Sequence, residues 1–190
     1  MLRACTNQVH GLIFTLTFAE TIFGAHMFTI REAMPGDWPG IWTIFHDVVR
    51  RGDTYAFAPD TDEDEAWRLW MDTPRATYVA VEDDEVIGTF YLKTNQPGAG
   101  SHVCNAGYMV RADQRGRGLG RALCVHSLDV ARDFGYHAMQ FNFVASTNRG
   151  AIKLWRDLGF EIVGTLPEAF KHPQNGYVDA LIMYRLLAAG

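Results

Sequence analysis

Cysteine is scarce in this sequence. Its three cysteines, Cys5, Cys104 and Cys124, are odd in number and widely spaced, and they form no C-x-x-C pair. Disulfide-stabilised domains and zinc knuckles depend on such pairs, so both classes are excluded and a reducing compartment, the cytoplasm, is predicted. The seven histidines also lack the H-E-x-x-H spacing of a zinc enzyme. We therefore predict no metal cofactor.

An excess of positive charge is also missing. The formal net charge of −5 gives no support for a nucleic-acid partner. The apolar stretch at residues 11–19 is shorter than the roughly 20 residues that cross a bilayer, so no membrane partner is predicted. Because only Arg3 precedes this stretch as a charge, we favour an N-terminal extension over residues 1–27, or an upstream start codon with Met27 as the natural beginning, to the alternative of a signal peptide. The folded domain is then expected from residue 28 to residue 190.

What is present is typical of one packed α/β domain. Apolar residues make up 48% of the 190-residue chain and charged residues 21%, which suits a single hydrophobic core. Apolar periodicity predicts helices near residues 37–52, 60–71, 119–134 and 148–158, and strands near 28–31, 77–81, 86–92, 102–110, 138–144, 160–166 and 177–187.

Glycines alternate at residues 116, 118 and 120, between a predicted strand and a predicted helix. Such a loop directs backbone N–H groups and the positive end of the helix dipole at one anion, and Arg115, Arg117 and Arg121 add charge nearby. The G-x-G-x-G spacing fits neither a Walker A loop, which requires G-K-[ST], nor the G-x-G-x-x-G dinucleotide fingerprint. Taken alone, the glycines leave open a plain surface turn as the alternative.

The stretch 108–123 resembles the acetyl-CoA motif of the GNAT superfamily of N-acetyltransferases, R-x-x-G-x-G after a strand, matched here by Arg115, Gly118 and Gly120. Residues 148–160 resemble that superfamily's second signature, an asparagine that opens a helix ending in Gly-Phe. The two signatures occur in the expected order, and the resemblance covers about residues 28–187. It implies a GNAT fold, an α/β (α+β) domain whose mixed, mainly antiparallel sheet of six to seven strands carries helices on both faces. The sheet is expected to splay between strands 102–110 and 138–144.

The resemblance also implies the activity, the transfer of an acetyl group from acetyl-CoA to an amine by direct attack in a ternary complex. Main-chain groups near Met109 and Val110 are expected to pair with the pantetheine arm, and Asn148 to hydrogen-bond it, with a plain helix N-cap as the alternative for Asn148. The pyrophosphate is expected on the amides of the glycine loop. The residues assigned to this task are Arg115, Gly116, Arg117, Gly118, Leu119, Gly120 and Arg121.

Trp155 departs from the superfamily pattern. Many members carry a tyrosine at this position, which is credited with protonating the departing thiolate. An indole N–H donates hydrogen bonds but is no general acid at neutral pH. We expect Trp155 to be a wall of the CoA site, with water protonating the thiolate.

The acceptor side offers no carboxylate base on its strands. Alternation puts Val103, Asn105 and Met109 on one face of their strand, and Gln140, Asn142 and Val144 on one face of the next. Asn105 and Asn142 are therefore expected to face each other in the substrate cleft, where an amide can orient an amine or hold a water. The alternative is that both asparagines satisfy backbone groups within the sheet.

Residues 88–93, 101–108, 141–143 and 147–148 resemble the fungal N-acetyltransferases that detoxify proline analogues such as azetidine-2-carboxylate, and the resemblance implies that the two asparagines line the acceptor site. Tyr55 and Phe57 lie where the superfamily builds its acceptor pocket and suit a small, partly apolar amine, with core packing as the alternative. Strand parity gives His102 a surface role. The expected partner is thus a small-molecule amine, an amino acid or a proline analogue. An acetylase of protein N-termini or lysines and a non-catalytic acyl-CoA-binding module remain as rivals, and a homodimer as an alternative to a monomer.

Overall fold

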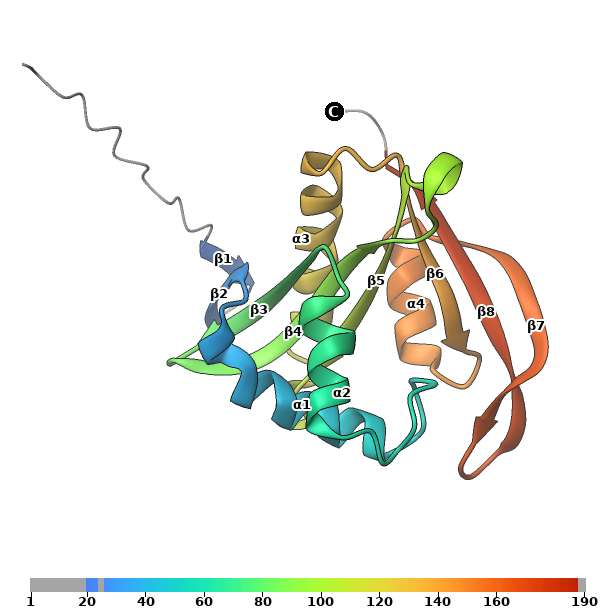
Figure 1. Ribbon diagram of the computed structural model, residues 1–190, viewed down its shortest axis with the longest axis horizontal. Coiled ribbons are helices and arrows are strands. Elements are labelled where there is room, and N and C mark those ends of the chain that lie inside the picture. Colours follow the sequence, from blue (N-terminus) through green and yellow to red (C-terminus); the bar gives the residue numbers. More distant parts are fainter. Residues whose placement is uncertain (1–19, 24–25, 188–190) are drawn as a thin grey trace, which may run out of the picture.

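The computed structural model describes residues 20–23 and 26–187 and contains one eight-stranded sheet in the order β1-β2-β3-β4-β5-β6-β8-β7 (Figure 1). All neighbouring strands are antiparallel except β5 and β6, which run parallel. The mixed, mainly antiparallel sheet is therefore confirmed, with one strand more than expected. The strands are β1 (Glu20–Phe23), β2 (His26–Glu32), β3 (Ala76–Glu82), β4 (Glu85–Thr94), β5 (Val103–Val110), β6 (Ala138–Ala145), β7 (Glu161–His172) and β8 (Gly176–Leu186).

The additional strand, β1, pairs with β2 and lies within the range predicted as an N-terminal extension. A domain boundary at residue 28 stays a prediction. The last hairpin is also longer than expected: β7 continues to His172 instead of ending at Leu166, with register shifts after Ile162 and Leu166. These irregularities interrupt the alternating pattern that sequence periodicity depends on.

Helices cover both faces of the sheet, as predicted (Figure 1). On one face, α1 (Trp38–Arg50) and α2 (Glu63–Trp67), which continues as a π-helical turn (Arg68–Asp72), enclose a core around Phe45 and Trp70. On the other face, α3 (Leu119–Asp133) and α4 (Arg149–Asp157) enclose a second core around Phe90 and Leu123.

Local sequence explains where these elements begin and end. The Asp62 side chain caps α2 by accepting a hydrogen bond from the Glu65 amide at 2.8 Å. Gly135, with φ of 80°, follows α3 and ends it. Asp83 and Asp84 make the turn between β3 and β4 with φ of 50° and 63°, in the left-handed region that aspartate tolerates better than most residues.

The sheet opens between β5 and β6. Only Val103–Ala138 and Cys104–Met139 pair across the two strands, and beyond them the strands diverge (Figure 1). The predicted splay is therefore present at the predicted strands. Backbone groups of β5 beyond Cys104 are left facing the gap, where a ligand can take the place of the missing strand.

Candidate active site

The glycine loop lies at the N-terminus of α3, and its backbone leaves a row of amides unpaired. Gly116 and Gly118 have φ of 80° and 81°, a conformation that glycine adopts without a Cβ penalty. Within the described residues, no main-chain amide from residue 115 to residue 120 donates a hydrogen bond, whereas the next two, of Arg121 and Ala122, donate to the Gly118 carbonyl. Free amides at the positive end of a helix attract an anion.

These amides border a cavity of about 760 Å³, which we call the larger cavity. It extends from the glycine loop along β5 to α4, and most residues predicted for the donor side line it. They are Met109, Val110, Arg115, Gly116, Gly118, Leu119, Gly120, Arg121, Asn148 and Trp155.

Arg117 is the exception among the loop residues. Its guanidinium donates to both carboxylate oxygens of Glu82, at 2.7 and 2.8 Å, and also contacts the Gln114 side chain. This ion pair neutralises the charge that Arg117 was expected to bring to the anion site, and its side chain lies outside the cavity lining. Arg115 and Arg121 are the loop arginines that line the cavity.

Asn148 caps α4, because its side-chain oxygen accepts a hydrogen bond from the Ala151 amide at 3.2 Å. The capping alternative is thus real, yet the same side chain also lines the larger cavity. One turn later, Trp155 is buried and its ring lies 5.0 Å from those of Tyr108 and Phe141, centroid to centroid. Trp155 is held as a rigid wall by these aromatic neighbours.

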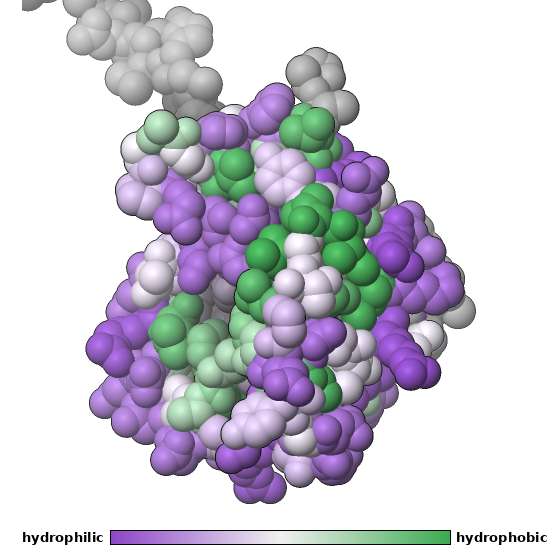
Figure 2. All heavy atoms as spheres, turned by 90° about the vertical axis from the view of Figure 1, so that its right-hand side faces the viewer, coloured by the Kyte–Doolittle hydropathy of each residue, from purple (hydrophilic) through white to green (hydrophobic). Residues whose placement is uncertain are grey.

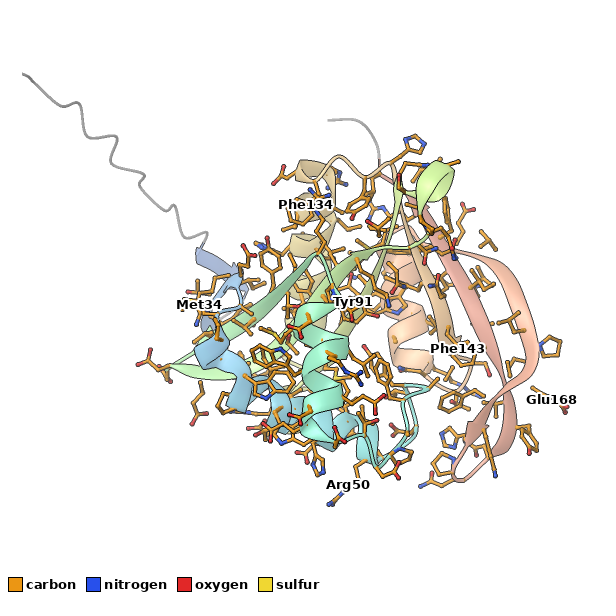
Figure 3. All side chains as sticks on the ribbon, in the orientation of Figure 1. Met34, Arg50, Tyr91, Phe134, Phe143 and Glu168 are labelled. Atoms are coloured by element: carbon orange, nitrogen blue, oxygen red, sulfur yellow. The ribbon has the colours of Figure 1, made fainter. Side chains whose placement is uncertain are left out.

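A second cavity of about 340 Å³, the smaller cavity, lies where β5 and β6 diverge. Asn105, Asn142, Tyr55 and Phe57, the residues predicted for the acceptor side, all line it. Figure 3 labels two further lining residues, Tyr91 of β4 and Phe143 of β6. The two cavities share the lining residues Thr54, Tyr55, Tyr108, Asn148, Ala151 and Trp155, so they meet at this point.

Asn105 is only 6% exposed and bridges the gap between the strands. Its Nδ2 donates to the Gln140 carbonyl on β6 at 2.9 Å, and its Oδ1 accepts from the Tyr91 hydroxyl at 3.1 Å. The expected alternative, satisfaction of a backbone group in the sheet, is therefore part of its role. One N–H and one lone pair of the amide remain for a ligand, because an asparagine amide offers two donors and two acceptor sites.

Asn142 is exposed and belongs to a chain of side-chain amides: Gln140 donates to Asn142 at 2.8 Å, and Asn142 donates to Asn95 at 2.7 Å. The pairing of β6 with β8 shifts register between Phe141 and Val144. Because of this bulge, Val144 packs against the same core as Phe141, so the expectation that Val144 shares the face of Asn142 is wrong.

Tyrosine hydroxyls surround the junction of the cavities. The Tyr55 hydroxyl donates to the Tyr108 carbonyl at 2.8 Å, which ties the loop after α1 to the open edge of β5. The Tyr108 hydroxyl lies 2.7 Å from Ser127 Oγ. Burial raises the pKa of Tyr55, raises that of Tyr108 further, and raises the pKa of Tyr91 to about 12. All three therefore keep their protons at neutral pH.

Several residues lining the larger cavity were missed in the sequence. Arg51, Asp53 and Thr54 follow α1, Thr147 precedes α4, and His172 ends β7. Arg51 Nε lies 3.7 Å from Asp53 Oδ1, and buried polar atoms of Arg51, Asp53, Thr54 and Thr147 find no hydrogen-bond partner within the described residues. Adjacency to Tyr55 could have indicated the first three, but nothing near His172 signals a site.

His102 is exposed, in line with its expected surface role. In the described part of the chain, no three His, Cys, Asp or Glu side chains lie close enough to hold a metal ion. Among the same residues, no helix is long and apolar enough to cross a membrane.

The sequence model of the Acetyltransferase (GNAT) family matches residues 38–160. The chain belongs to this family. It is thus a GNAT N-acetyltransferase, an acyltransferase, and the assignment from its two signatures is confirmed.

Curated relatives of this GNAT acetyltransferase act on different molecules. It is 40% identical to N-acetyltransferase aca1 of Schizosaccharomyces pombe over 51% of the chain, and the match spans about half, 47%, of aca1. It is 38% identical to the L-methionine sulfoximine/L-methionine sulfone acetyltransferase of Pseudomonas aeruginosa, over 74% of the chain and 84% of that protein. Relatives of the chain thus acetylate small amino-acid-like molecules.

Solved structures confirm the GNAT fold. A GCN5-related N-acetyltransferase from Kribbella flavida superposes with a TM-score of 0.81 at 46% identity, over 84% of this chain and 98% of that one. The acetyltransferase yncA of Salmonella typhimurium, 25% identical with a TM-score of 0.73 over 85% of this chain and 94% of its own, was solved with its cofactor acetyl-CoA. Members of this family therefore bind acetyl-CoA.

Proposed function

We propose that this GNAT enzyme transfers the acetyl group of acetyl-CoA to the amine of a small molecule, an amino acid or a proline analogue, by direct attack in a ternary complex. The observation that carries the proposal is the meeting of two cavities, one with an anion site on the glycine loop and one beside the amides of Asn105 and Asn142. Two substrates held at once at such a junction react without a covalent enzyme intermediate, and proximity supplies much of the rate.

On the donor side, the larger cavity fits acetyl-CoA, which supplies the activated acetyl group. The free amides of residues 115–120 would hold the pyrophosphate, with Arg115 and Arg121 adding positive charge. The unpaired edge of β5 at Met109 and Val110 would pair with the amides of the pantetheine arm, and Asn148 would bind the same arm. Trp155 forms the wall between this arm and the acceptor.

On the acceptor side, the amides of Asn105 and Asn142 would orient the amine, and Tyr55 and Phe57 would pack against its apolar part. Support comes from their place in the smaller cavity and from the stacking of Tyr55 on Phe57 at 5.5 Å. The volume of about 340 Å³ suits a molecule of amino-acid size. The amino-acid-like substrate named for the Pseudomonas aeruginosa relative supports the same class.

The test is a thiol-release assay with purified enzyme, acetyl-CoA and a panel of amines: amino acids, L-azetidine-2-carboxylate, polyamines and short peptides. We expect release above hydrolysis with amino acids or the proline analogue, and intersecting lines in double-reciprocal plots. Parallel lines would contradict direct attack. Preference for peptides would favour a protein N-terminal or lysine acetylase, and tight CoA binding without release by any amine would favour a binding module.

We also propose a homodimer located in the cytoplasm. Figure 2 shows apolar side chains gathered on the face that contains β7 and β8, where Val163, Leu166 and Leu186 are exposed; such patches on a protein surface are typical of interfaces. Buried free thiols at Cys104 and Cys124 suit a reducing compartment. Light scattering should give a dimer mass that Val163→Glu lowers to a monomer; a monomeric wild type would contradict this.

A further inference from the structure

Lys93 carries the only charge among the side chains that line the smaller cavity in the described structure. It stands on β4, paired in register with Asn105 of β5, so the two side chains share one face at the edge of the strand gap. Its Nζ lies 5.4 Å from the ring centre of Tyr91. Within the described residues, no carboxylate forms an ion pair with Lys93, although most arginines around it in sequence have one.

The surroundings of Lys93 leave its charge directed at the cavity. The residue is half-buried, and Tyr91 offers it a ring face, which is attractive to a cation but neutralises no charge. Neighbouring polar groups of the wall, Asn105 and Asn142, are neutral amides. A lysine in a partly apolar cavity without a counter-ion attracts an anionic group from a ligand.

We propose that Lys93 binds the carboxylate of the acceptor, so that the substrates are amines with a carboxylate close to the reacting nitrogen. The inference rests on the proposed function and narrows it from amines in general to amino acids and their cyclic analogues. In such a molecule one carbon separates the amine from the carboxylate. The amine can then stand at the junction beside Tyr108 and Trp155 while the carboxylate is directed at Lys93 and the free N–H of Asn105.

Pairing at Lys93 also helps the amine to lose its proton. In a free zwitterion, the carboxylate stabilises the neighbouring ammonium, which raises the pKa of the amine. When Lys93 neutralises the carboxylate, that stabilisation is removed, and the positive charge of the lysine disfavours the ammonium further. The expected result is a larger fraction of neutral, nucleophilic amine at neutral pH, in a cavity whose lining has no carboxylate base.

The experiment compares each acid with its neutral amide, by calorimetric titration into the enzyme saturated with CoA, which measures binding without turnover. The ligand pairs are L-azetidine-2-carboxylate with L-azetidine-2-carboxamide, and L-methionine sulfone with its primary amide. The variants are Lys93→Gln and Lys93→Arg, and the matched control is Lys171→Gln, which removes one positive charge from an exposed site on β7 outside both cavities.

We expect Lys93→Gln to weaken binding of the better-bound acid about ten- to hundredfold, as for the loss of a charged hydrogen bond, and to change its amide less than about twofold. Lys93→Arg should retain most of the affinity, and Lys171→Gln all of it. Wherever acetylation of the acid is measurable, Lys93→Gln should also move the rise of kcat/KM to higher pH.

Equal losses for acid and amide in Lys93→Gln, with an unchanged melting temperature, would overturn the carboxylate site and leave Lys93 a packing role. Wild-type binding of the amides as tightly as the acids would overturn it too, as would binding of neither. The proposed function fails on a different result, the absence of thiol release with every amine, which the titrations do not depend on.

Discussion

Two glycines of the loop before and within α3 should respond in opposite directions to the same change. Gly118 precedes α3 with φ of 81°, and an added Cβ there would have no heavy atom within 4 Å. Its replacement by alanine is therefore a test of backbone conformation alone. Gly120 lies inside the first turn of α3, where a Cβ would meet Leu154 Cδ2 at 3.5 Å, an ordinary van der Waals distance.

The magnitudes follow from these two environments. Left-handed backbone costs a residue with a Cβ about 1–2 kcal/mol, so Gly118→Ala should lower the melting temperature by about 2–8 °C at this chain length. Alanine is favoured over glycine within a helix by up to about 1 kcal/mol, so Gly120→Ala should raise it by about 1–4 °C. Gly116, with φ of 80° and open space around it, should behave like Gly118.

Thermal melts followed by circular dichroism, without and with acetyl-CoA, measure both effects. Without ligand the two variants should lie on opposite sides of wild type. With acetyl-CoA both should gain less stability than wild type, because each adds a methyl group beside amides that would approach the pyrophosphate. A Gly118→Ala melt equal to wild type would show that φ at this position is not imposed by the fold, and a Gly120→Ala melt below wild type would refute the stated helix gain.

Three further predictions concern the scaffold around the site. Asp37 accepts hydrogen bonds from Arg31 at 2.7 Å and from the Met34 amide, which lowers the pKa of Asp37; Asp37→Asn should therefore cost about 1 kcal/mol in urea unfolding at neutral pH, a loss that is complete above the ordinary carboxyl pKa near 4 and narrows as the pH falls through the lowered folded value. A gap that widens in acid would contradict this sign. Tyr91→Phe removes the donor to Asn105 Oδ1, and steady-state kinetics should give a several-fold higher KM for the acceptor with unchanged CoA affinity, since Tyr91 lines only the smaller cavity; a matching loss of CoA affinity would speak against that separation. Trp70→Phe removes a fully buried indole and its 3.0 Å hydrogen bond to Thr89 Oγ1 and should lower the free energy of unfolding by about 2–4 kcal/mol without changing KM, which denaturant titration and kinetics together can refute.

The donor side was predictable because its signals are local. Gly118 must be glycine for its positive φ, and Asn148 caps a helix that begins at the next residue. Each feature depends on a few consecutive residues, so the order strand, loop, helix could be read without knowing what packs against it. The loop amides then follow from helix geometry, because the first amides of any α-helix lack internal partners.

The acceptor side depends on contacts between distant segments, which local patterns do not contain. Asn105 joins Tyr91 of β4 to Gln140 of β6, 35 residues further along the chain. The bulge that turns Val144 into the core breaks the two-residue period from which its direction was predicted. Likewise, the ion pair that removes Arg117 from the anion site needs Glu82, which comes from the β3 end of a hairpin.

The same long-range arrangement constrains the proton transfers. Asp53 is the one carboxylate that lines either cavity in the described structure, and it borders the larger cavity with Arg51 Nε 3.7 Å away. The hydroxyls of Tyr55, Tyr91 and Tyr108 keep their protons at neutral pH because burial raises the pKa of each. No lining group of the smaller cavity is therefore a base at neutral pH, and an incoming amine loses its proton to water or binds in its neutral form. Under that condition the field of the cavity decides the reactive fraction, which is why a lone lysine beside two neutral amides is a more useful neighbour for the amine than a distant carboxylate.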